Sequence, residues 1–565
     1  MKAKLKNIFK EIIGVNIFVK SLAVFAFFLI ISTSLYMGFT RLSSSDDHYF
    51  HFKFAEVMRE NGVMNSLGNF ETIPYSKIAE GHRFENYNFL FYYSIIPFTY
   101  LEPLFLGIKL YAVFAVSLAF LLLFLGFHLV KARYPFVYTI STFALLGYGL
   151  LWRFFLSRPY ALAPALLIII IAFLYQRRYK SVALISFLYF FWHGATFFFP
   201  LFVCFTYFVA EIFHNKKPDY KKVWAPIAGL VGSIVLVYII SPGFFVYIKD
   251  NVFNVVYDTV FGKSVNIAEG GEVYPKDFFD FIGNNIFIVS VFIFFTVIEV
   301  IRYFSLKVGS IDFYNYAGRL SDERRYLQST FFFLTLGFFI GTVAVSGRFM
   351  DFFAFFVGFY IFLSLESLFG FFRVSDLNIK KSITVGLLIA VSYLFANNSL
   401  LLVKTFSTGS NPYTFAGIGN WLNKNVKKND VIFNVSWNWL PQLYYYFPQG
   451  RYVAGLEPRF MYEYNPKMFW LWSNIEKGIV CESEKCEQVL SEQQKALNLQ
   501  KKTKPSEWFK LEGNKIAFVV KTYFKSNYIV SINLDSALNS ALDESDYVTK
   551  SFDDGVYRVY AIHNP

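Results

Sequence analysis

Residues 19–52 read VKSLAVFAFFLIISTSLYMGFTRLSSSDDHYFHF. The first part, 19–39, is almost entirely apolar, and about 20 such residues are enough for a helix to cross a bilayer. The run is too long for a cleavable signal peptide and has no small-residue cleavage site. A polar segment with two adjacent carboxylates, Asp46 and Asp47, follows directly. We therefore expect a membrane helix that opens into an acidic loop.

Further apolar runs of this kind continue up to residue 404. They lie at 106–129, 135–152, 159–175, 181–193, 196–213, 223–241, 284–302, 328–346, 350–370 and 383–403, and the fourth of these is short. Apolar residues make up 55% of the chain and charged residues only 16%, whereas soluble domains are nearer one quarter charged. The sequence predicts a polytopic α-helical membrane domain, residues 1–404, with about eleven transmembrane helices.

Basic residues give the expected orientation. The loops between alternate runs are rich in Lys and Arg, as is the N-terminus with Lys2, Lys4, Lys6 and Lys10. Cytoplasmic loops of membrane proteins carry this excess, so the net charge of +13 reflects topology and not nucleic-acid binding. We expect a multi-pass protein of the plasma membrane with a cytoplasmic N-terminus. The long loops 40–105 and 242–283 are then extracytoplasmic, as is the region from 405 onward.

The segment 88–105 is apolar but is interrupted by Pro97, Glu102 and Pro103. We interpret it as an interfacial or re-entrant helix, because an irregular backbone at membrane depth must be buried in protein. The alternative is a true span, which would invert every later loop.

Residues 405–565 resemble an ordinary soluble domain. Short β-rich runs at 430–434, 515–521 and 556–562 alternate with helical stretches such as 482–499. The pattern predicts a mixed α/β extracytoplasmic domain.

The three cysteines do not form a zinc motif, because no matching second pair exists. Cys204 lies in an apolar run, which is typical of a small buried hydrophobic residue. Cys481 and Cys486 are either a local disulfide, which an extracytoplasmic domain permits, or two free thiols.

The acidic pair is the first candidate for chemistry. Ionisable groups at a membrane boundary are functional candidates, although Asp can also cap the helix that we expect at 48–61. Four residues separate Asp47 from His51, so both side chains lie on one helix face. A carboxylate and an imidazole together can remove a proton from an acceptor or hold a divalent cation.

Four segments resemble the catalytic subunit of oligosaccharyltransferases, which belong to the GT-C class of lipid-dependent glycosyltransferases. The first is DHYFH and the helix that ends in ENG, 47–62; the others are SVNIAE at 264–269, GRF at 347–349 and SWNW at 436–439. The eleven spans followed by an outer soluble domain are similar too. The family's acidic pair after the third span is absent: the residues there, 152–160, read WRFFLSRPY, and this Arg-Pro-Tyr looks more like general lipid-phosphate-sugar transferases of the GT-C class.

The resemblance implies the role of each residue in the acidic loop. Asp47 would be the catalytic base, with Asp46 and His51 beside it, or a metal ligand together with Glu269. The cofactor would be a divalent cation, Mg²⁺ or Mn²⁺, and the missing acidic pair predicts that the enzyme needs it weakly or not at all.

The arginines fit the same class, in which a polyprenyl phosphate or pyrophosphate leaves as an anion. Arg348 resembles the arginine that contacts the lipid-linked phosphate. Arg153 and Arg158 fall at the same predicted side, and guanidinium groups bind phosphate bidentately. The alternative is interfacial contact with lipid headgroups, and the neighbouring pair Trp192-His193 has the same interfacial interpretation, with an exposed imidazole.

Besides Glu269, which is also a candidate for substrate binding, five further residues are candidates for sugar or acceptor binding. They are His82, Arg83 and Glu85 in the first outer loop, and Trp437 and Trp439 in the soluble domain. The loop residues have an alternative interpretation as plain loop surface.

We expect a glycosyltransferase of the cell envelope that moves a sugar or glycan from a polyprenyl-linked donor, in contact with membrane lipid, to an extracytoplasmic glycan, lipid or protein. The nearest alternative is an oligosaccharyltransferase that N-glycosylates Asn side chains. An alternative of another class is a lipid or solute transporter, whose functional ionisable residues would lie near the bilayer midplane; the candidates are Glu211, Glu299 and Glu366.

Overall fold

The computed structural model describes most of the chain in two compact units. The described residues are 17–42, 47–62, 72–76, 88–214, 219–240, 275–308, 322–371, 377–455, 458–483, 486, 505–534 and 536–563. The first unit is the membrane domain and contains α2 and the helices from α5 to α20. The second unit contains α3 and all described elements from α21 onward.

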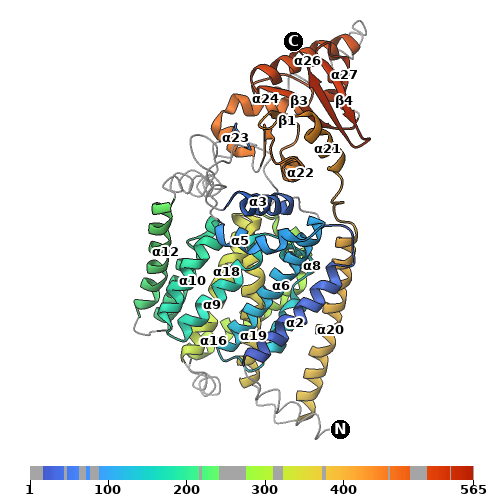
Figure 1. Cartoon of the computed structure of the whole chain (residues 1–565). Coiled ribbons are helices and arrows are strands. Elements are labelled where there is room, and N and C mark those ends of the chain that lie inside the picture. The colour runs from blue at the N-terminus through green and yellow to red at the C-terminus, as the bar shows by residue number, and fades with distance from the viewer. Residues whose placement is uncertain are drawn as a thin grey trace. The chain divides into compact units, whose positions relative to one another are not determined.

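The membrane domain is helical, and its helices run roughly side by side (Figure 1). They are α2 (Ile17–Tyr36), α5 (Phe89–Ile95), α6 (Leu104–Leu129), α7 (Pro135–Leu145), α8 (Tyr148–Phe154), α9 (Ala163–Tyr175), α10 (Tyr179–Trp192), α11 (Phe199–Phe213), α12 (Lys221–Ile240), α15 (Phe278–Asn284), α16 (Ile286–Val308), α18 (Asp322–Ala344), α19 (Met350–Phe371) and α20 (Leu377–Ser407). Short 3₁₀ turns join some of them: η1 (Ile96–Tyr100), η2 (Pro159–Ala161), η3 (Gly194–Thr196) and η5 (Gly347–Phe349).

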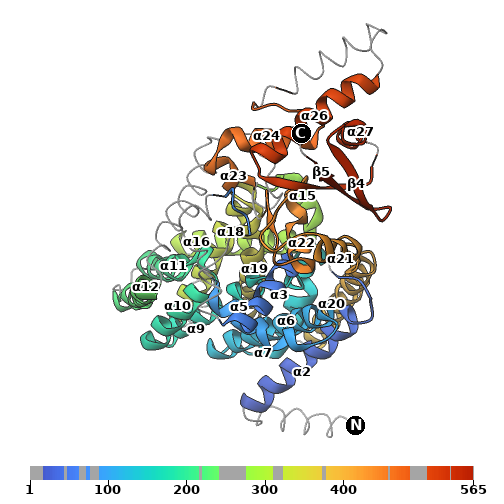
Figure 2. The same cartoon turned by 45° about the horizontal axis from the view of Figure 1, so that its top comes forward.

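Each predicted span coincides with helix in the structure. Within the described residues, seven helices are long and apolar enough to cross a membrane, or nine if each of two bent pairs counts as one span. The remaining two, α9 and α10, are apolar but shorter. They pack against each other, and α12 packs against α10 (Figure 2). The chain is therefore a multi-pass membrane protein.

The predicted span 135–152 is not one straight helix. It breaks between α7 and α8, which meet at 109°. The break exposes backbone carbonyls that a bilayer cannot satisfy, and the Asn398 amide from α20 donates to two of them, Ala144 O at 2.9 Å and Leu146 O at 2.8 Å. A second bend of 98° separates α15 from α16.

The segment 88–105 does not form one long helix. It contains the seven residues of α5 and the five of η1 before α6 begins, and these pieces pack against α6 and α10. A helix that crosses the bilayer needs about 20 residues, so the interfacial or re-entrant interpretation fits this geometry and the alternative of a true span does not.

Aromatic rings fill the core between α6, α9, α18 and α19. Phe127 and Phe359 stack with centroids 4.0 Å apart, and Phe331 stacks on Phe359 at 4.3 Å. Gly126 lets these helices approach closely, because a Cβ there would lie 2.6 Å from a methyl group of Ile168. Much of the high phenylalanine content is therefore packed inside the bundle.

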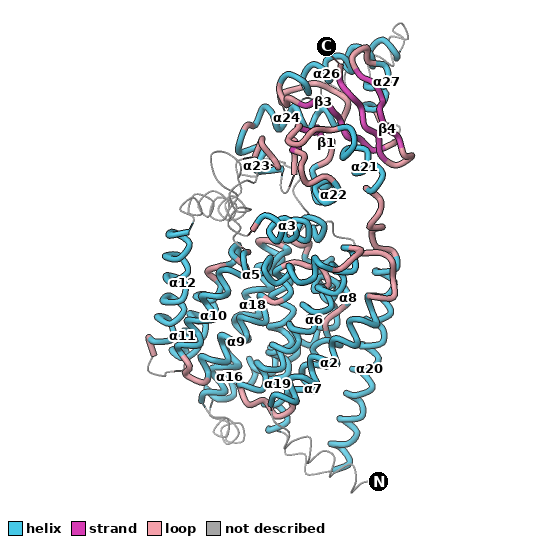
Figure 3. The backbone as a smooth tube through the Cα atoms, viewed as in Figure 1, coloured by secondary structure: helices cyan, strands magenta, loops and turns pink. Residues whose placement is uncertain are grey.

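The second unit is a mixed α/β structure around one sheet (Figure 3). Its elements are α3 (Asp47–Asn61), α21 (Ala416–Asn425), β1 (Val431–Asn434), η6 (Trp437–Trp439), α22 (Leu440–Tyr446), β2 (Arg451–Tyr452), α23 (Pro458–Tyr464), α24 (Pro466–Glu476), α26 (Pro505–Thr522), β3 (Ser526–Ile532), α27 (Ala537–Glu544), β4 (Val548–Asp553) and β5 (Tyr557–Ile562). The strand order is β2-β1-β3-β5-β4, with parallel pairing on the β1 side and antiparallel pairing on the β5 side.

The two faces of the sheet follow from the alternation of side chains along β3. Ile529 belongs to the buried core that α24, α26 and α27 cover. Its neighbour Tyr528 instead meets Trp421 of α21, with ring centroids 5.9 Å apart. Helices thus cover both faces of the sheet.

The predicted strands at 430–434 and 556–562 are present as β1 and β5, but the strand predicted at 515–521 is wrong. These residues belong to α26, whose buried Ile516 and Val520 are four residues apart and face the core. The β-rich run is only the end of a longer segment with helical periodicity. The helix predicted at 482–499 lies almost wholly outside the described residues.

Cys481 and Cys486 form a disulfide, which resolves the two alternatives that the sequence left open. Cys204 is a buried free thiol, as expected.

Candidate functional site

Three connections meet at one end of the membrane domain. The Trp192 Nε1–H donates to Pro159 O at 2.8 Å, which ties the end of α10 to η2. The centroid of the His193 ring lies 4.6 Å from that of Tyr160 and 6.4 Å from that of Phe352 in α19. Thus η2, the α10–η3 connection and the start of α19, although far apart in sequence, converge on His193.

Two predicted phosphate-binding arginines lie at this convergence. Arg158 immediately precedes η2, and Arg348 lies inside η5, directly before α19. Both are half-buried. The Ser346 hydroxyl accepts a hydrogen bond from the Arg348 backbone N–H at 3.3 Å and caps this turn. We call the end of the membrane domain that carries Arg158, His193 and Arg348 the arginine end.

Arg153 differs from the other two. Its side chain is only 5% exposed and forms a two-point ion pair with Asp351, with Nε–Oδ1 at 2.5 Å and Nη2–Oδ2 at 2.8 Å. Its charge is already matched by a buried carboxylate, an arrangement that joins helices. The three arginines that the sequence grouped together therefore divide into a partly exposed pair and a buried, ion-paired residue.

Lys109 is a buried cation that sequence reasoning missed. It is 1% exposed, and its ammonium donates to the carbonyls of Tyr36, at 3.4 Å, and of Phe39. A cation at a helix C-terminus is favourable because of the helix dipole, so Lys109 joins the start of α6 to the end of α2. The sequence did contain a signal. A single lysine inside an apolar run is energetically costly, so such a residue usually has a structural or functional role.

His193 contradicts its interfacial interpretation, in which the imidazole was exposed. The side chain is 1% exposed, because the rings of Tyr160 and Phe352 surround it. The Gly194 backbone N–H that follows donates to Asn88 Oδ1 at 3.2 Å, which brings the start of α5 to the same point. A histidine beside a membrane-edge tryptophan carries no sequence signal for such burial, because the covering residues come from distant helices.

Asp47 is the first residue of α3 in the second unit. The predicted helix is present, and its apolar face packs on α22: the ring of Phe50 lies 5.4 Å from that of Tyr444. His51 follows Asp47 by one helical turn, so the two side chains share a face as predicted. Asp47 and His51 are both half-buried.

Several predicted site residues lie outside the described residues. They are Asp46, His82, Arg83, Glu85 and Glu269. Among the residues that the structure describes, no group of three or more His, Cys, Asp or Glu side chains is arranged to hold a metal ion. The predicted pairing of Asp47 with Glu269 as metal ligands stays a prediction.

Trp437 and Trp439 are both half-buried in η6. Trp437 packs against the main core of the second unit. The ring of Trp439 lies 5.6 Å from that of Tyr557 in β5 and 6.4 Å from that of Phe415. Both tryptophans therefore help to assemble this unit, in addition to the acceptor binding that was predicted for them.

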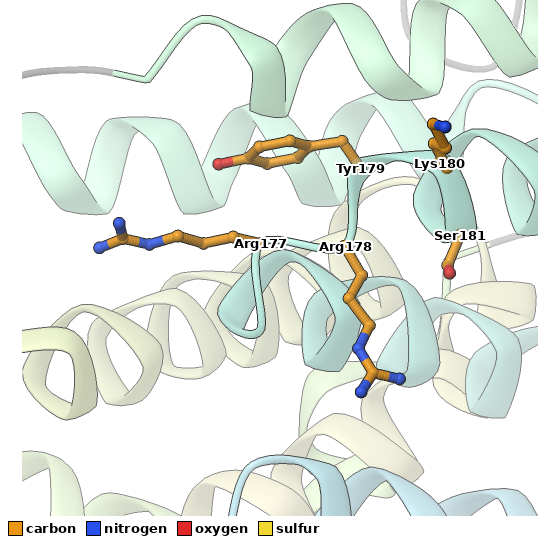
Figure 4. Close-up of a pocket in the computed structure, with 5 residues that line it drawn as sticks. All are labelled: Arg177, Arg178, Tyr179, Lys180 and Ser181. Atoms are coloured by element: carbon orange, nitrogen blue, oxygen red, sulfur yellow. The ribbon is translucent and has the colours of Figure 1, made fainter.

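A small pocket of about 380 Å³ lies at the other end of α9. It is lined by Arg177, Arg178, Tyr179, Lys180 and Ser181. In Figure 4 the two arginine side chains point in different directions, so they do not form a clamp. Because α9 has 13 residues, this pocket and Arg158 are separated by about 20 Å along the helix.

Two of the three acidic residues that would favour a transporter, Glu211 and Glu366, have basic partners. Glu211 forms a buried ion pair with Lys222 from α12, and Glu366 pairs with Arg324 from α18 at 2.6 Å. The side chain of Glu299 lies outside the described residues. Both described carboxylates thus join neighbouring helices near their ends.

No family model matches the sequence, and a search of curated proteins finds no match. Among solved structures, the chain is similar to ArnT from Cupriavidus metallidurans bound to undecaprenyl phosphate. The two share 11% identity, and the match covers 97% of this chain and 99% of ArnT with a TM-score of 0.51. The apo structure of ArnT matches with 11% identity, 97% and 98% coverage and a TM-score of 0.49.

The likeness extends over nearly the whole of both chains, membrane domain and C-terminal domain included. It shows that this chain has the fold of the GT-C membrane glycosyltransferases, the class to which ArnT belongs. The resemblance drawn from the sequence motifs is thus confirmed at the level of the fold, as is the predicted architecture of membrane domain and mixed α/β domain.

Proposed function

We propose that this protein is a membrane glycosyltransferase that transfers a sugar or glycan from a polyprenyl phosphate or pyrophosphate donor to an acceptor on the extracytoplasmic side. The observation that carries the proposal is the match over nearly the full length to a GT-C structure that holds undecaprenyl phosphate. Fold alone does not define a reaction, so the residues must supply the chemistry.

The first requirement of the reaction is stabilisation of the leaving phosphate, and Arg158 and Arg348 supply it. Both are held at the arginine end by η2 and η5, and both are half-buried. When the bond between the sugar and the phosphate breaks, negative charge develops on the phosphate oxygens. Pre-positioned guanidinium groups stabilise that charge more in the transition state than in the ground state, which is what accelerates a reaction.

The second requirement is a base that takes up the proton of the acceptor, and Asp47 supplies it. The acceptor attacks the anomeric carbon through a hydroxyl or amide group, and the proton that it loses passes to the Asp47 carboxylate. The position of Asp47 in the first turn of α3 suits this role, because the chain around it is held by the packing of α3 on α22. A divalent cation held by Asp47 and Glu269 is an alternative way to activate the acceptor or to orient the donor.

The disulfide supports the proposed topology. Disulfides persist in oxidising compartments, and the Cys481–Cys486 pair lies in the unit that we assign to the extracytoplasmic side. Basic loops at 131–133, 176–178 and 373–381 then lie in the cytoplasm, in agreement with the charge rule. The partners of the protein in this arrangement are membrane lipid and an acceptor at the outer surface of the plasma membrane.

The experiment is a binding and transfer assay with the purified full-length protein. Undecaprenyl phosphate should raise the unfolding temperature, whereas undecaprenol, which lacks the phosphate, should have little effect. A radiolabelled undecaprenyl-phosphate-linked sugar should then label glycan, lipid or protein fractions of the membrane. The proposal fails if the two lipids act alike and no fraction is labelled.

Two further arms separate the alternatives. An Asn-x-Ser/Thr peptide with an oligosaccharide donor tests for an oligosaccharyltransferase, which the four motif segments favour; a glycopeptide product would support it. Movement of the lipid-linked sugar across a reconstituted bilayer without any transfer would support a transporter instead.

A further inference from the structure

His193 is held by a chain of hydrogen bonds that orients its ring. The hydroxyl of Tyr189 lies 2.8 Å from that of Thr196, which in turn is hydrogen-bonded to His193 Nδ1. Tyr189 is completely buried and His193 is 1% exposed. Buried polar groups of this kind are almost always satisfied, so the direction of the chain can be worked out.

The direction follows from the protons that need acceptors. Among the described residues, the hydrogen-bond partner of the Tyr189 hydroxyl is Thr196 and no other. If Thr196 donated to Tyr189, the phenol proton would be buried without an acceptor, which is unfavourable. The satisfied arrangement has Tyr189 donating to Thr196 and Thr196 donating to Nδ1 of His193.

This arrangement determines the tautomer of the imidazole. A neutral histidine carries one proton, and a ring nitrogen that accepts a hydrogen bond does not hold it. The proton therefore lies on Nε2, which becomes a hydrogen-bond donor. Among the described residues, the ring's hydrogen-bond partner is Thr196, at Nδ1. A donor in so enclosed a position needs an acceptor, and a ligand or a water can supply it at Nε2.

The surroundings indicate what kind of ligand it is. Arg348 lies four residues before Phe352, whose ring centroid is 6.4 Å from that of His193, and the contact with Tyr160 at 4.6 Å brings in the loop that begins with Arg158. A site that combines guanidinium groups with a neutral N–H donor complements an anionic oxygen. Phosphate oxygens accept such charge-assisted hydrogen bonds strongly.

We propose that His193 is a donor-binding residue whose Nε2–H binds a phosphate oxygen of the polyprenyl-linked substrate, at the arginine end that also carries Arg158 and Arg348. Tyr189 and Thr196 are positioning residues that hold the imidazole in the donor tautomer. This inference rests on the proposed function and identifies a further ligand of the same phosphate.

The test compares the binding of undecaprenyl phosphate with that of undecaprenol to the purified full-length protein. His193→Ala should weaken binding of undecaprenyl phosphate roughly tenfold or more, as expected for one hydrogen bond to a charged group, and leave undecaprenol binding unchanged. His193→Gln, whose amide nitrogen reaches the position of Nε2, should retain most of the affinity. His193→Asn, whose amide nitrogen is nearer to Nδ1, should not.

Thr196→Val tests the orienting chain, because it removes the donor to Nδ1 while keeping the side-chain shape. It should weaken undecaprenyl phosphate binding by a smaller factor than His193→Ala. His128→Ala is the matched control, since His128 is exposed in the last turn of α6, and it should change neither affinity.

The other outcomes are decisive as well. Equal loss of both lipids in His193→Ala would show a purely structural role, and unchanged affinity for undecaprenyl phosphate would show that a water occupies the site; either overturns the inference. Should His193→Ala fail to fold, the comparison of the Gln and Asn variants decides. If the wild-type protein does not prefer undecaprenyl phosphate to undecaprenol, the proposed donor class fails, and that result is distinct from the failure of His193 alone.

Discussion

The guanidinium of Arg153 and the carboxylate of Asp351 form a buried two-point ion pair that joins α8 to α19. The two bonds measure 2.5 and 2.8 Å, and the side chains are 5% and 3% exposed. Asp351 lies three residues after Arg348, in the first turn of α19. The pair therefore fixes the helix start that presents Arg348 at the arginine end.

Breaking this pair should destabilise the protein strongly. Asp351→Asn leaves the Arg153 charge buried without its counter-charge, and removal of one partner of a buried pair costs about 3–5 kcal/mol. We expect a clear fall in the thermal unfolding temperature of the detergent-purified protein. The double variant Arg153→Met, Asp351→Leu removes both charges and should recover most of the stability. If the double variant is no more stable than Asp351→Asn, the ion pair is not the cause.

Loss of either half-buried arginine at the arginine end should act on binding and not on stability. Arg158→Ala and Arg348→Ala should each weaken binding of undecaprenyl phosphate by roughly ten- to a hundredfold, the loss expected when a charged hydrogen bond is removed. Isothermal titration or native mass spectrometry of the purified protein measures the change.

Arg177→Ala provides the control for these variants, because it removes the same group at the opposite end of α9 and should leave the affinity intact. Equal effects of all three variants would indicate a non-specific attraction between the protein's net positive charge and the anionic lipid.

Much of the fold could be predicted because it depends on local composition. Apolar runs long enough to span a bilayer locate the helices from the sequence alone, and the acidic start of α3 with its apolar face predicts that helix. The bend between α7 and α8 could not be predicted, since the group that satisfies its carbonyls is Asn398, more than 250 residues later in the chain. The end of α26 was wrongly predicted as a strand, because its final residues resemble a strand when they are considered alone.

The candidate site was predictable only in part. Arg158 and Arg348 stand out because charge beside an apolar run is rare. Arg153 differs from them in its ion pair with Asp351. Because Asp351 is 198 residues away, no local sequence pattern indicates this pair. His193 was misread for the same reason, because its burial is produced by Tyr160 and by a ring from α19.

Reduction of the Cys481–Cys486 disulfide should lower the stability of the second unit modestly. The bridge closes a loop with a sequence separation of five, and the loss of chain entropy for so short a loop corresponds to roughly 2 kcal/mol. Thiol labelling of the intact protein should detect one cysteine, Cys204, under denaturing conditions and three after reduction. Labelling of all three without reductant would contradict the disulfide and weaken the extracytoplasmic assignment.

Asp47→Asn should abolish transfer while the protein still folds and inserts. Asp47 is the first residue of α3, and the loss of one negative charge from a helix start costs only about 0.3–1 kcal/mol, so α3 should still form, whereas an amide cannot accept the acceptor's proton. Loss of a general base lowers the rate by about 10²- to 10⁴-fold, and transfer of a labelled sugar from the lipid-linked donor measures it. Glu60→Gln removes a carboxylate from the exposed end of the same helix and should be fully active. An Asp47→Asn variant with wild-type transfer would refute the assignment of Asp47 as the base.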